Sequence, residues 1–297
     1  GNMALKTAEA LKNETDVDLI MIHSPIDSFT GGLLDLADNV EDAKFDWLDL
    51  TVEVRRRIAA DRSGSIGAVP VDADAMILYY RRDIIGEADV PRSWEEWIAL
   101  AKRLNGTDMN GDGEPDYGVC INGDGLQQHL LFAMAASVFQ TTDDSREGSF
   151  YTLNADDKTP MTSVFESVGW KHVFEINKTL FQYGTRQDTP LGTNFNLFAE
   201  GRCALYWSYP SAGTLTTRNN SYIFGKLGVV ASPGSKTVYD RKTEKMVACT
   251  ARRCPFATAG AGNRPMYLAG GMRLLVPKTA PNADMALDFA AYMSTNM

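Results

Sequence analysis

The chain has 297 residues, of which 44% are hydrophobic and 23% are charged, a composition typical of a globular protein with a substantial core. Its formal net charge of −9 argues against a nucleic-acid-binding or anionic-membrane-binding surface, because either would need basic patches. No apolar stretch approaches the ~18 residues of a membrane span, so direct membrane insertion is not expected.

Residues 17–23 (VDLIMIH) form an uninterrupted apolar run, which is typical of a parallel strand covered on both faces. In open α/β sheets, ligands bind at the carboxyl ends of the strands. The sequence therefore favours His23 and Ser24, at the end of this strand, as ligand contacts. A hydrogen-bonded loop histidine is a nearly equal interpretation of His23.

An aromatic and branched run, Ala75 to Tyr80, predicts a buried strand. Asp72 and Asp74 stand just before it. Two carboxylates this close are compatible with a glycosidase pair, but no nucleophile motif accompanies them. Ligand binding, or simple polarity at the entry of the strand, is the better interpretation.

Ser93 and Glu96 predict the capping box of a helix whose apolar residues, Trp94 to Leu104, repeat at helical spacing. The loop after this helix sets side-chain oxygens at alternate positions, similar to an EF-hand whose closing glutamate is replaced by Val119. We expect weak calcium binding or, equally, a metal-free hydrogen-bonded turn; no cofactor is required. The candidate calcium ligands are Asp108, Asn110, Asp112, Glu114 and Asp116.

Four segments, taken in order, resemble the family 1 extracellular solute-binding proteins, which include maltose-binding proteins and other sugar receptors of ABC importers. The segments are 70–72 (PVD), 79–83 (YYRRD), 93–96 (SWEE) and 110–113 (NGDG). The resemblance implies a two-lobed α/β fold of the periplasmic-binding-protein-like type II class, with a hinge and a ligand cleft between the lobes. It also implies a hydroxyl-binding role for Asp74.

The family presents ligand contacts where a strand, here Tyr117 to Ile121, leads into a helix, here Leu126 to Phe139. This resemblance indicates Asp124, Gln127 and Gln128 as ligand-binding residues, with exposed turn polarity as the alternative.

Residues 196–206 resemble another family segment, after which relatives carry a tryptophan that stacks on sugar. Ser211 occupies that tryptophan position here, so we expect Trp207 and Tyr209 to provide a displaced aromatic platform. A core position is an equally good interpretation of Trp207.

Residues 267–277 (YLAGGMRLLVP) resemble the third family signature, a Gly-Gly pair followed by an apolar strand. Gly270 and Gly271 would allow the backbone to approach a ligand closely, and Tyr267 is expected to contribute to the same site. A final helix is expected over 283–293, with Met285, Phe289 and Met293 on its buried side.

The strand Ala75 to Tyr80 and the turn Ser232 to Gly234 match the family's crossings between lobes. We therefore expect an N-terminal lobe of residues 1–77 and 234–297 and a C-terminal lobe of residues 78–233. Because family members normally extend further at both ends, the chain is interpreted as part of a longer protein.

The cysteines predict one disulfide. Cys249 and Cys254 are close enough in sequence to form a bridge, which we favour over free thiols and which implies an oxidising compartment. Cys120 and Cys203 lie in apolar strands and are expected to be buried free thiols.

No phosphate-binding loop and no zinc-protease or serine-hydrolase motif is found, so an enzyme is not expected. The leading hypothesis is an extracellular or periplasmic module, secreted or at the outer face of the plasma membrane, that captures a small polar ligand for an ABC importer. A sugar or oligosaccharide is the favoured ligand, and the membrane permease is the partner. The alternative is the ligand-sensing ectodomain of a larger membrane receptor with a transmembrane partner; a glycosidase is a minor third hypothesis.

Overall fold

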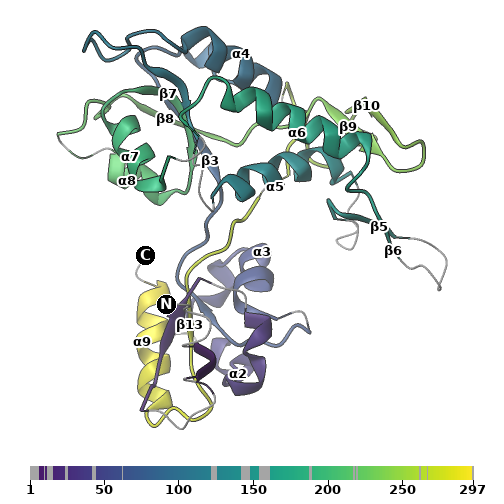
Figure 1. Cartoon of the computed structure of the whole chain (residues 1–297). Coiled ribbons are helices and arrows are strands. Elements are labelled where there is room, and N and C mark those ends of the chain that lie inside the picture. Colours follow the sequence, from purple (N-terminus) through teal and green to yellow (C-terminus); the bar gives the residue numbers. More distant parts are fainter. Residues whose placement is uncertain are drawn as a thin grey trace. The chain divides into compact units, whose positions relative to one another are not determined.

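The computed structural model divides the chain into two units. Unit 1 comprises Gly1–Ala75 and Leu268–Met297, and unit 2 comprises Met76–Tyr267 (Figure 1). The described residues are 7–9, 11, 16–23, 26–41, 45–61, 63–121, 126–141, 148–153, 161–186, 189–216, 218, 220–260, 262–265 and 267–295.

A three-stranded antiparallel sheet, of order β1-β13-β2, forms the centre of unit 1. The strands are β1 (Ile20–Ile22), β13 (Arg273–Leu275) and β2 (Val69–Pro70). The helices are η1 (Ile26–Ser28), η2 (Thr30–Gly32), α2 (Ala37–Val40), η4 (Trp47–Asp49), α3 (Val52–Val54), the π-helix η5 (Arg55–Ala59) and α9 (Ala283–Thr295).

The expectation of a parallel strand over residues 17–23 is wrong. In the described residues β1 pairs with β13, whose chain runs antiparallel to it. The apolar run nevertheless has a physical reason, because Ile22 belongs to one hydrophobic cluster and Leu19 packs against another. A continuous apolar run thus indicates that both faces of a strand are packed against other residues, but it does not indicate whether the strand pairs in parallel or antiparallel fashion.

The expected buried side of the last helix is also partly wrong. Met285 and Phe289 are 71% and 51% exposed. The buried residues of α9 are Ala286, Leu287, Ala290 and Ala291, and Met293 packs against the same core cluster. Small alanine side chains let α9 approach the sheet, so the buried stripe lies beside the one that the larger residues indicated.

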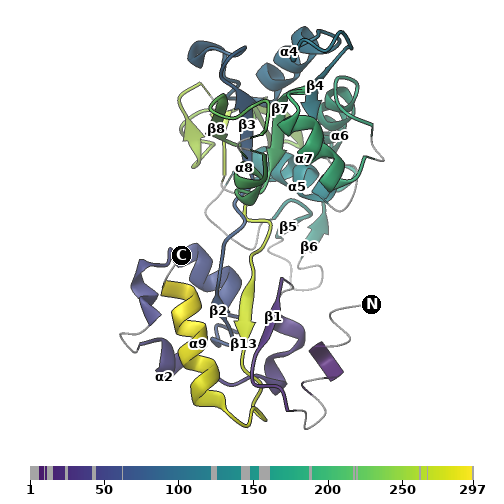
Figure 2. The same ribbon diagram turned by 90° about the vertical axis from the view of Figure 1, so that its left-hand side faces the viewer.

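Unit 2 is built around a four-stranded sheet of order β4-β7-β3-β8, in which only the β4–β7 pair is parallel (Figure 2). The strands are β4 (Tyr117–Cys120), β7 (Cys203–Ser208), β3 (Ile77–Arg81) and β8 (Leu227–Ala231). The helices are η6 (Glu87–Asp89), α4 (Trp94–Leu104), α5 (Leu126–Phe139), α6 (Val168–Phe181), α7 (Leu191–Ala199) and α8 (Ser211–Thr216).

The predicted capping box at the start of α4 is confirmed. Ser93 Oγ accepts a hydrogen bond from the Glu96 backbone amide, and the Glu96 carboxylate accepts one from the Ser93 amide, each at 3.3 Å. Further along α4, the carbonyl of Ala101 lies against Gly118 of β4, where any side chain would overlap it. The helix therefore packs directly on the strand.

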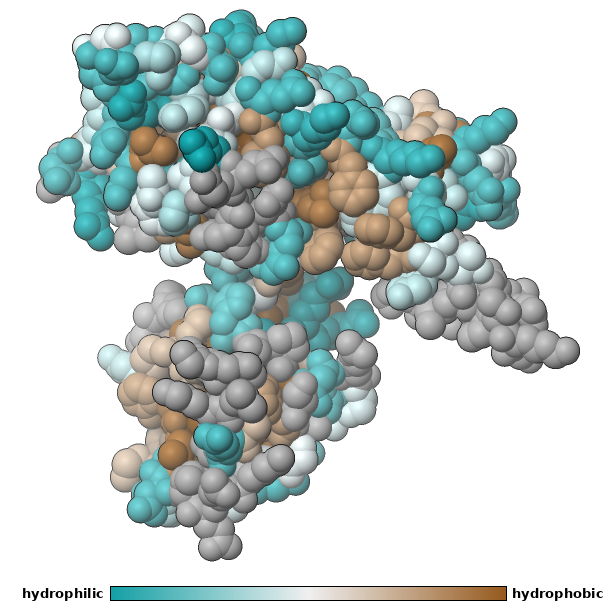
Figure 3. All heavy atoms as spheres, in the orientation of Figure 1, coloured by the Kyte–Doolittle hydropathy of each residue, from teal (hydrophilic) through white to brown (hydrophobic). Residues whose placement is uncertain are grey.

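Three short strand pairs complete unit 2, and aromatic side chains gather near one of them. Figure 3 shows hydrophobic side chains on the surface near α5 and β5; Phe150, Phe165 and Phe174 are partly exposed around the buried Trp170. The pairs are β5 (Tyr151–Leu153) with β6 (Met161–Ser163), β9 (Thr237–Asp240) with β10 (Lys245–Ala248), and β11 (Ala257–Thr258) with β12 (Gly262–Asn263).

Residues 234–267 group with unit 2, whereas the sequence assigned them to the N-terminal lobe. The side-chain amide of Asn263 explains this, because it donates to the carbonyls of Ser137 and Gln140 at 2.8 and 2.9 Å. Lys236 adds an ion pair with Glu96 at 2.7 Å. The return of the chain to unit 1 thus comes at Leu268.

Both cysteine pairs are bonded. Cys249 is joined to Cys254, the pair expected from sequence. Cys120 and Cys203 are also joined, with their Cα atoms 5.6 Å apart, so the expectation of free thiols at these two positions is wrong. The physical reason is the pairing of β4 with β7, which brings together residues separated by 83 positions.

Candidate functional site

In unit 1, a histidine and a carboxylate meet beside the segment that returns from unit 2. His23 Nε2 lies 3.0 Å from Asp74 Oδ2, and their side chains are 43% and 16% exposed. Asp74 is held by its backbone, since its amide donates to Gly270 O at 3.0 Å and its carbonyl accepts from the Ala269 amide at 2.9 Å. The structure therefore fixes the two expected contacts, His23 and Asp74, as one polar pair.

The Gly-Gly pair allows this packing. Gly270 has φ of 144°, and a Cβ atom there would lie 2.8 Å from His23 Cε1. A side chain at Gly271 would overlap the Asp72 carbonyl. Close approach thus occurs at both glycines, and within the described residues the neighbours that approach are His23 at Gly270 and Asp72 and Ile58 at Gly271.

Asp72 and Arg273 also act electrostatically on His23. Asp72 Oδ1 accepts a 2.6 Å hydrogen bond from the Met272 amide, so part of this carboxylate is already engaged. Arg273 is 2% exposed and donates to Ile58 O at 3.0 Å. Burial lowers the pKa of Arg273, while Asp27 and Asp72 counteract that effect. The sequence analysis missed Arg273, although a single arginine within an apolar strand was an available signal.

A pH titration checks the His23–Asp74 pair. The hydrogen bond that the His23 ring donates to the Asp74 carboxylate raises the pKa of His23 above its usual 6.5, whereas burial lowers the pKa of His172. The stability from His23 is therefore fully present below the unfolded pKa and is lost as pH rises through the higher folded value. We expect the NMR signal of the His23 ring to titrate above that of His172.

Asp74→Asn supplies the control for this titration. Loss of the negative charge is expected to lower the His23 midpoint and to leave the His172 midpoint unchanged, because the pKa of His172 is shifted by burial and by Glu95 and not by Asp74. Equal midpoints for the two histidines in the parent chain would contradict the pair.

In unit 2, a second set of side chains surrounds His129. His129 Nδ1 and the Tyr267 hydroxyl are joined by a 3.0 Å hydrogen bond. The Tyr209 ring meets the His129 ring edge-on, with centroids 6.4 Å apart. Burial raises the pKa of Tyr267 to about 12, so its hydroxyl stays protonated at neutral pH. Tyr209 and Tyr267 were expected ligand contacts, whereas His129 was missed although it directly follows the two candidate glutamines.

The remaining expected contacts are placed differently. Trp207 is 3% exposed and its indole N–H donates to Ser232 Oγ at 2.7 Å, which fits the core interpretation. Gln128 is exposed on α5. Ser24, Asp124 and the side chain of Gln127 lie outside the described residues.

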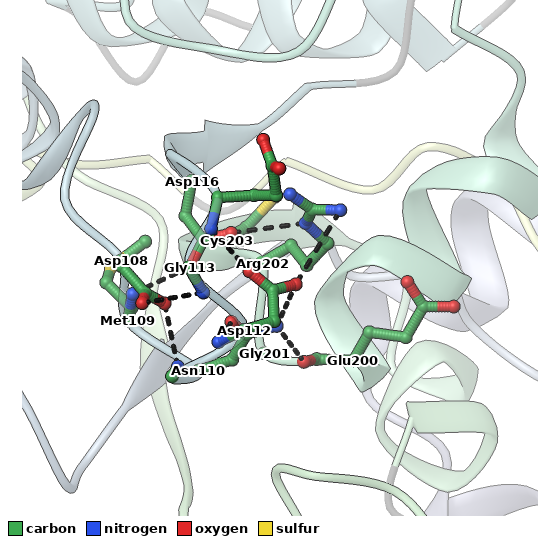
Figure 4. A network of polar contacts seen from close by, with 12 residues as sticks. Asp108, Met109, Asn110, Asp112, Gly113, Asp116, Glu200, Gly201, Arg202 and Cys203 are labelled. Carbon is green, nitrogen blue, oxygen red and sulfur yellow. Dashed lines mark hydrogen bonds and ion pairs between the residues drawn. The ribbon is translucent and has the colours of Figure 1, made fainter.

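The Asp-rich loop is a hydrogen-bonded turn (Figure 4). Asp108 accepts from the amides of Gly111 and Gly113 at 2.7 and 2.9 Å. Asp116 accepts from the Met109 amide at 2.7 Å and from Arg202 Nε at 3.2 Å.

The expected calcium site gains no support from this geometry. Over the described ranges of the chain, no group of three or more His, Cys, Asp or Glu side chains is placed to hold a metal ion. The carboxylates of Asp108 and Asp116 are directed to donors of the protein. The metal-free alternative therefore accounts for the loop.

A family model described as bacterial extracellular solute-binding protein matches residues 3–296. The chain belongs to this family. The expected resemblance is thereby confirmed, and the family is one of binding proteins that act without a cofactor and are not enzymes.

Several relatives of this solute-binding protein are known. Mannitol-binding protein from Pseudomonas aeruginosa is 26% identical over 200 residues, which cover 64% of this chain and 41% of that protein. A solute-binding protein of an ABC transporter from Agrobacterium vitis S4, solved with bound D-mannitol, is similar with a TM-score of 0.68 at 18% identity. The match covers 99% of this chain and 63% of that one.

A second solved structure is similar to the same extent. The ABC transporter solute-binding protein from Agrobacterium radiobacter K84, in complex with ribitol, gives a TM-score of 0.69 at 18% identity over 99% of this chain and 66% of that one. These likenesses confirm the expected two-lobed α/β fold of the periplasmic-binding-protein-like class. All three relatives are named as binding proteins, so the receptor-ectodomain and glycosidase hypotheses gain no support from them.

Proposed function

We propose that this solute-binding protein captures a polyol or a sugar outside the cytoplasmic membrane, in the periplasm or extracellular space, and delivers it to the permease of an ABC importer. Family membership supports solute capture. The names of the relatives support the ligand class, because they refer to mannitol, D-mannitol and ribitol. Among the described helices, none combines the length and apolar character needed to cross a bilayer.

The geometry of Asp74 carries the proposal. His23 engages Oδ2 of this carboxylate at 3.0 Å, while in the described part of the chain no donor is bonded to Oδ1. A charged acceptor that is already oriented by a neighbour binds a ligand hydroxyl strongly, with about 1.5–3 kcal/mol per hydrogen bond. Polyols and sugars present such hydroxyls on adjacent carbons.

Tyr209 and Tyr267 supply complementary chemistry in unit 2. A half-buried aromatic ring such as Tyr209 can cover the C–H face of a sugar or polyol. Burying roughly 100 Å² of apolar surface there would contribute about 2.5 kcal/mol. His129 is hydrogen-bonded to the Tyr267 hydroxyl and packs edge-on against the Tyr209 ring, so it helps to orient that ring. Aromatic contact would thus supply affinity, and Asp74 would select for hydroxyl groups.

The two-lobed fold of the similar solute-binding proteins favours a single ligand for both sets. Ala75 bridges to Leu268, and the next amide, of Met76, donates to Tyr267 O at 3.2 Å. The two crossing segments are thus paired with each other within unit 1 and again within unit 2. We expect one ligand to contact both sets and to favour the ligand-closed form of the protein, since only differential affinity shifts such an equilibrium.

Calorimetric titration with D-mannitol, ribitol and a neutral amino acid tests the ligand class. We expect saturable binding of the polyols and none of the amino acid. Asp74→Ala should weaken polyol binding by roughly 10–150-fold, the equivalent of one lost charged hydrogen bond. Asp49→Ala is the control, because Asp49 is an exposed carboxylate of the same unit. Absent polyol binding, or equal losses in both variants, would refute the proposal.

A further inference from the structure

A cavity of about 570 Å³ opens on unit 2 beside the Asp-rich loop. Its size falls within the ~300–1,000 Å³ typical of small-molecule sites. It lies where β4 and β7 begin, whereas Tyr209 follows the other end of β7, roughly 20 Å along a six-residue strand. The polar side chains that line it include Asn110, Asp112, Glu200, Arg202, Arg218 and Asn220.

The floor of the cavity is held in place by the protein (Figure 4). Arg202 Nε donates to Asp116 Oδ1 at 3.2 Å, and the Asp116 side chain is 0% exposed. Arg202 also lies 3.8 Å from Asp112. Asn110 donates to Asp112 Oδ2 and to Glu200 O, both at 3.2 Å. These groups are preorganised, so a ligand would not have to order them.

Other polar side chains of the lining are available to bind a ligand. Figure 4 shows the Glu200 carboxylate directed away from the drawn contacts. Throughout the described part of the chain, no side-chain hydrogen bond or ion pair engages Glu200 or Arg218. Asn196 and Asn220 add two exposed amides, each with a donor and an acceptor. The cavity thus offers donors and acceptors from several directions.

The charge balance indicates an uncharged ligand. Two carboxylates, of Asp112 and Glu200, face two guanidinium groups, of Arg202 and Arg218, so the lining carries no excess charge to attract an ion. An aromatic platform is missing as well, because Lys226 Nζ lies 3.7 Å from the centroid of Tyr222, the one aromatic residue of the described lining. Hydrogen bonding to hydroxyl groups remains as the mode of binding.

We propose that this cavity is a second binding site for a neutral polyhydroxylated molecule of monosaccharide size. The site belongs to unit 2 alone and does not depend on the proposed function of Asp74 and Tyr209. Because every contact is a solvent-exposed hydrogen bond, affinity is expected in the millimolar range, on the order of 10⁻³ M.

NMR titration of the whole chain with D-mannitol tests the second site. We expect saturable shifts of the amide signals of Gly111, Gly113 and Gly201, which directly follow or precede lining residues in the chain. Glu200→Ala and Arg218→Ala should each weaken this response by roughly fivefold, the equivalent of one lost hydrogen bond. Both residues are exposed, and an otherwise unchanged amide spectrum would show that the variants are folded.

Two further variants separate the sites. Asp74→Ala should leave the shifts at Gly111 and Gly201 intact, so a failure of the proposed function would not remove this response. Arg56→Ala, which changes an exposed arginine of unit 1, should also leave the ligand-induced shifts at Gly111 and Gly201 unchanged. Shifts that never saturate, or that are equal in the parent, Glu200→Ala and Arg218→Ala chains, would overturn the second site.

Discussion

Replacing Cys120 and Cys203 together by alanine is expected to lower the free energy of unfolding by about 4.5 kcal/mol. The disulfide closes a loop between residues 83 positions apart. The closed loop has less conformational entropy in the unfolded state, so the bond makes unfolding less favourable. Both residues are fully buried, so the variant also loses packing between β4 and β7. Urea unfolding, with the transition followed by circular dichroism, measures the difference.

The second disulfide is a matched control. Cys249 and Cys254 are separated by only 5 positions, so the same reasoning gives about 2 kcal/mol for their replacement by alanine. The loss for the Cys120 and Cys203 pair should therefore be about twice as large. Equal losses for the two pairs would show that loop closure is not the source of the stabilisation.

Gly118→Ala is expected to destabilise the chain by about 3 kcal/mol, at the upper end of the usual cost of overpacking. A Cβ atom at Gly118 would overlap the Ala101 carbonyl, and neither backbone can yield without separating α4 from β4. Thermal and urea unfolding measure the change, and binding need not be assayed.

Gly192→Ala gives the comparison for this substitution. Gly192 lies within α7, and a Cβ atom there would have no neighbour within 4 Å, so alanine should raise stability by up to about 1 kcal/mol through helix propensity. If Gly118→Ala proves as stable as the parent chain, α4 and β4 do not pack as closely as the structure shows.

Local signals in the sequence were sufficient for several elements. The helix expected over Leu126 to Phe139 has the bounds of α5, and the capping box at Ser93 is present. Capping and helical periodicity involve residues only a few positions apart, so they can be recognised without the fold. The same holds for the family resemblance, which rests on short segments in a given order.

Long-range pairings could not be predicted in this way. Cys120 and Cys203 were assigned as free thiols because nothing in the sequence states that β4 lies beside β7. The grouping of residues 234–267 with unit 2 likewise depends on Asn263, which bonds to carbonyls more than 120 positions away. In α9, two apolar stripes compete, and only the packed structure identifies the alanine stripe as the buried one.

The candidate site shows the same division. His23 and Asp74 were identified one by one, from a strand end and from a family position, but their pairing across 51 residues came from the structure. His129 was missed because a histidine within a helix carries no signal until its neighbour Tyr267 is known. Arg273 was also missed: a single arginine within an apolar strand is visible in the sequence, but its backbone-carbonyl partners are not.

The binding of one polyol by both residue sets can be tested most directly by calorimetric titration of D-mannitol into four chains. These are the parent, Asp74→Ala, Tyr209→Ala and Phe224→Ala, the last being a control at an exposed aromatic residue of unit 2. The parent and Phe224→Ala should bind equally at the high-affinity site. Asp74→Ala and Tyr209→Ala should each weaken that binding by roughly tenfold or more, as expected for a lost hydrogen bond and a lost aromatic contact. Unchanged affinity in either of these two variants would contradict a shared ligand.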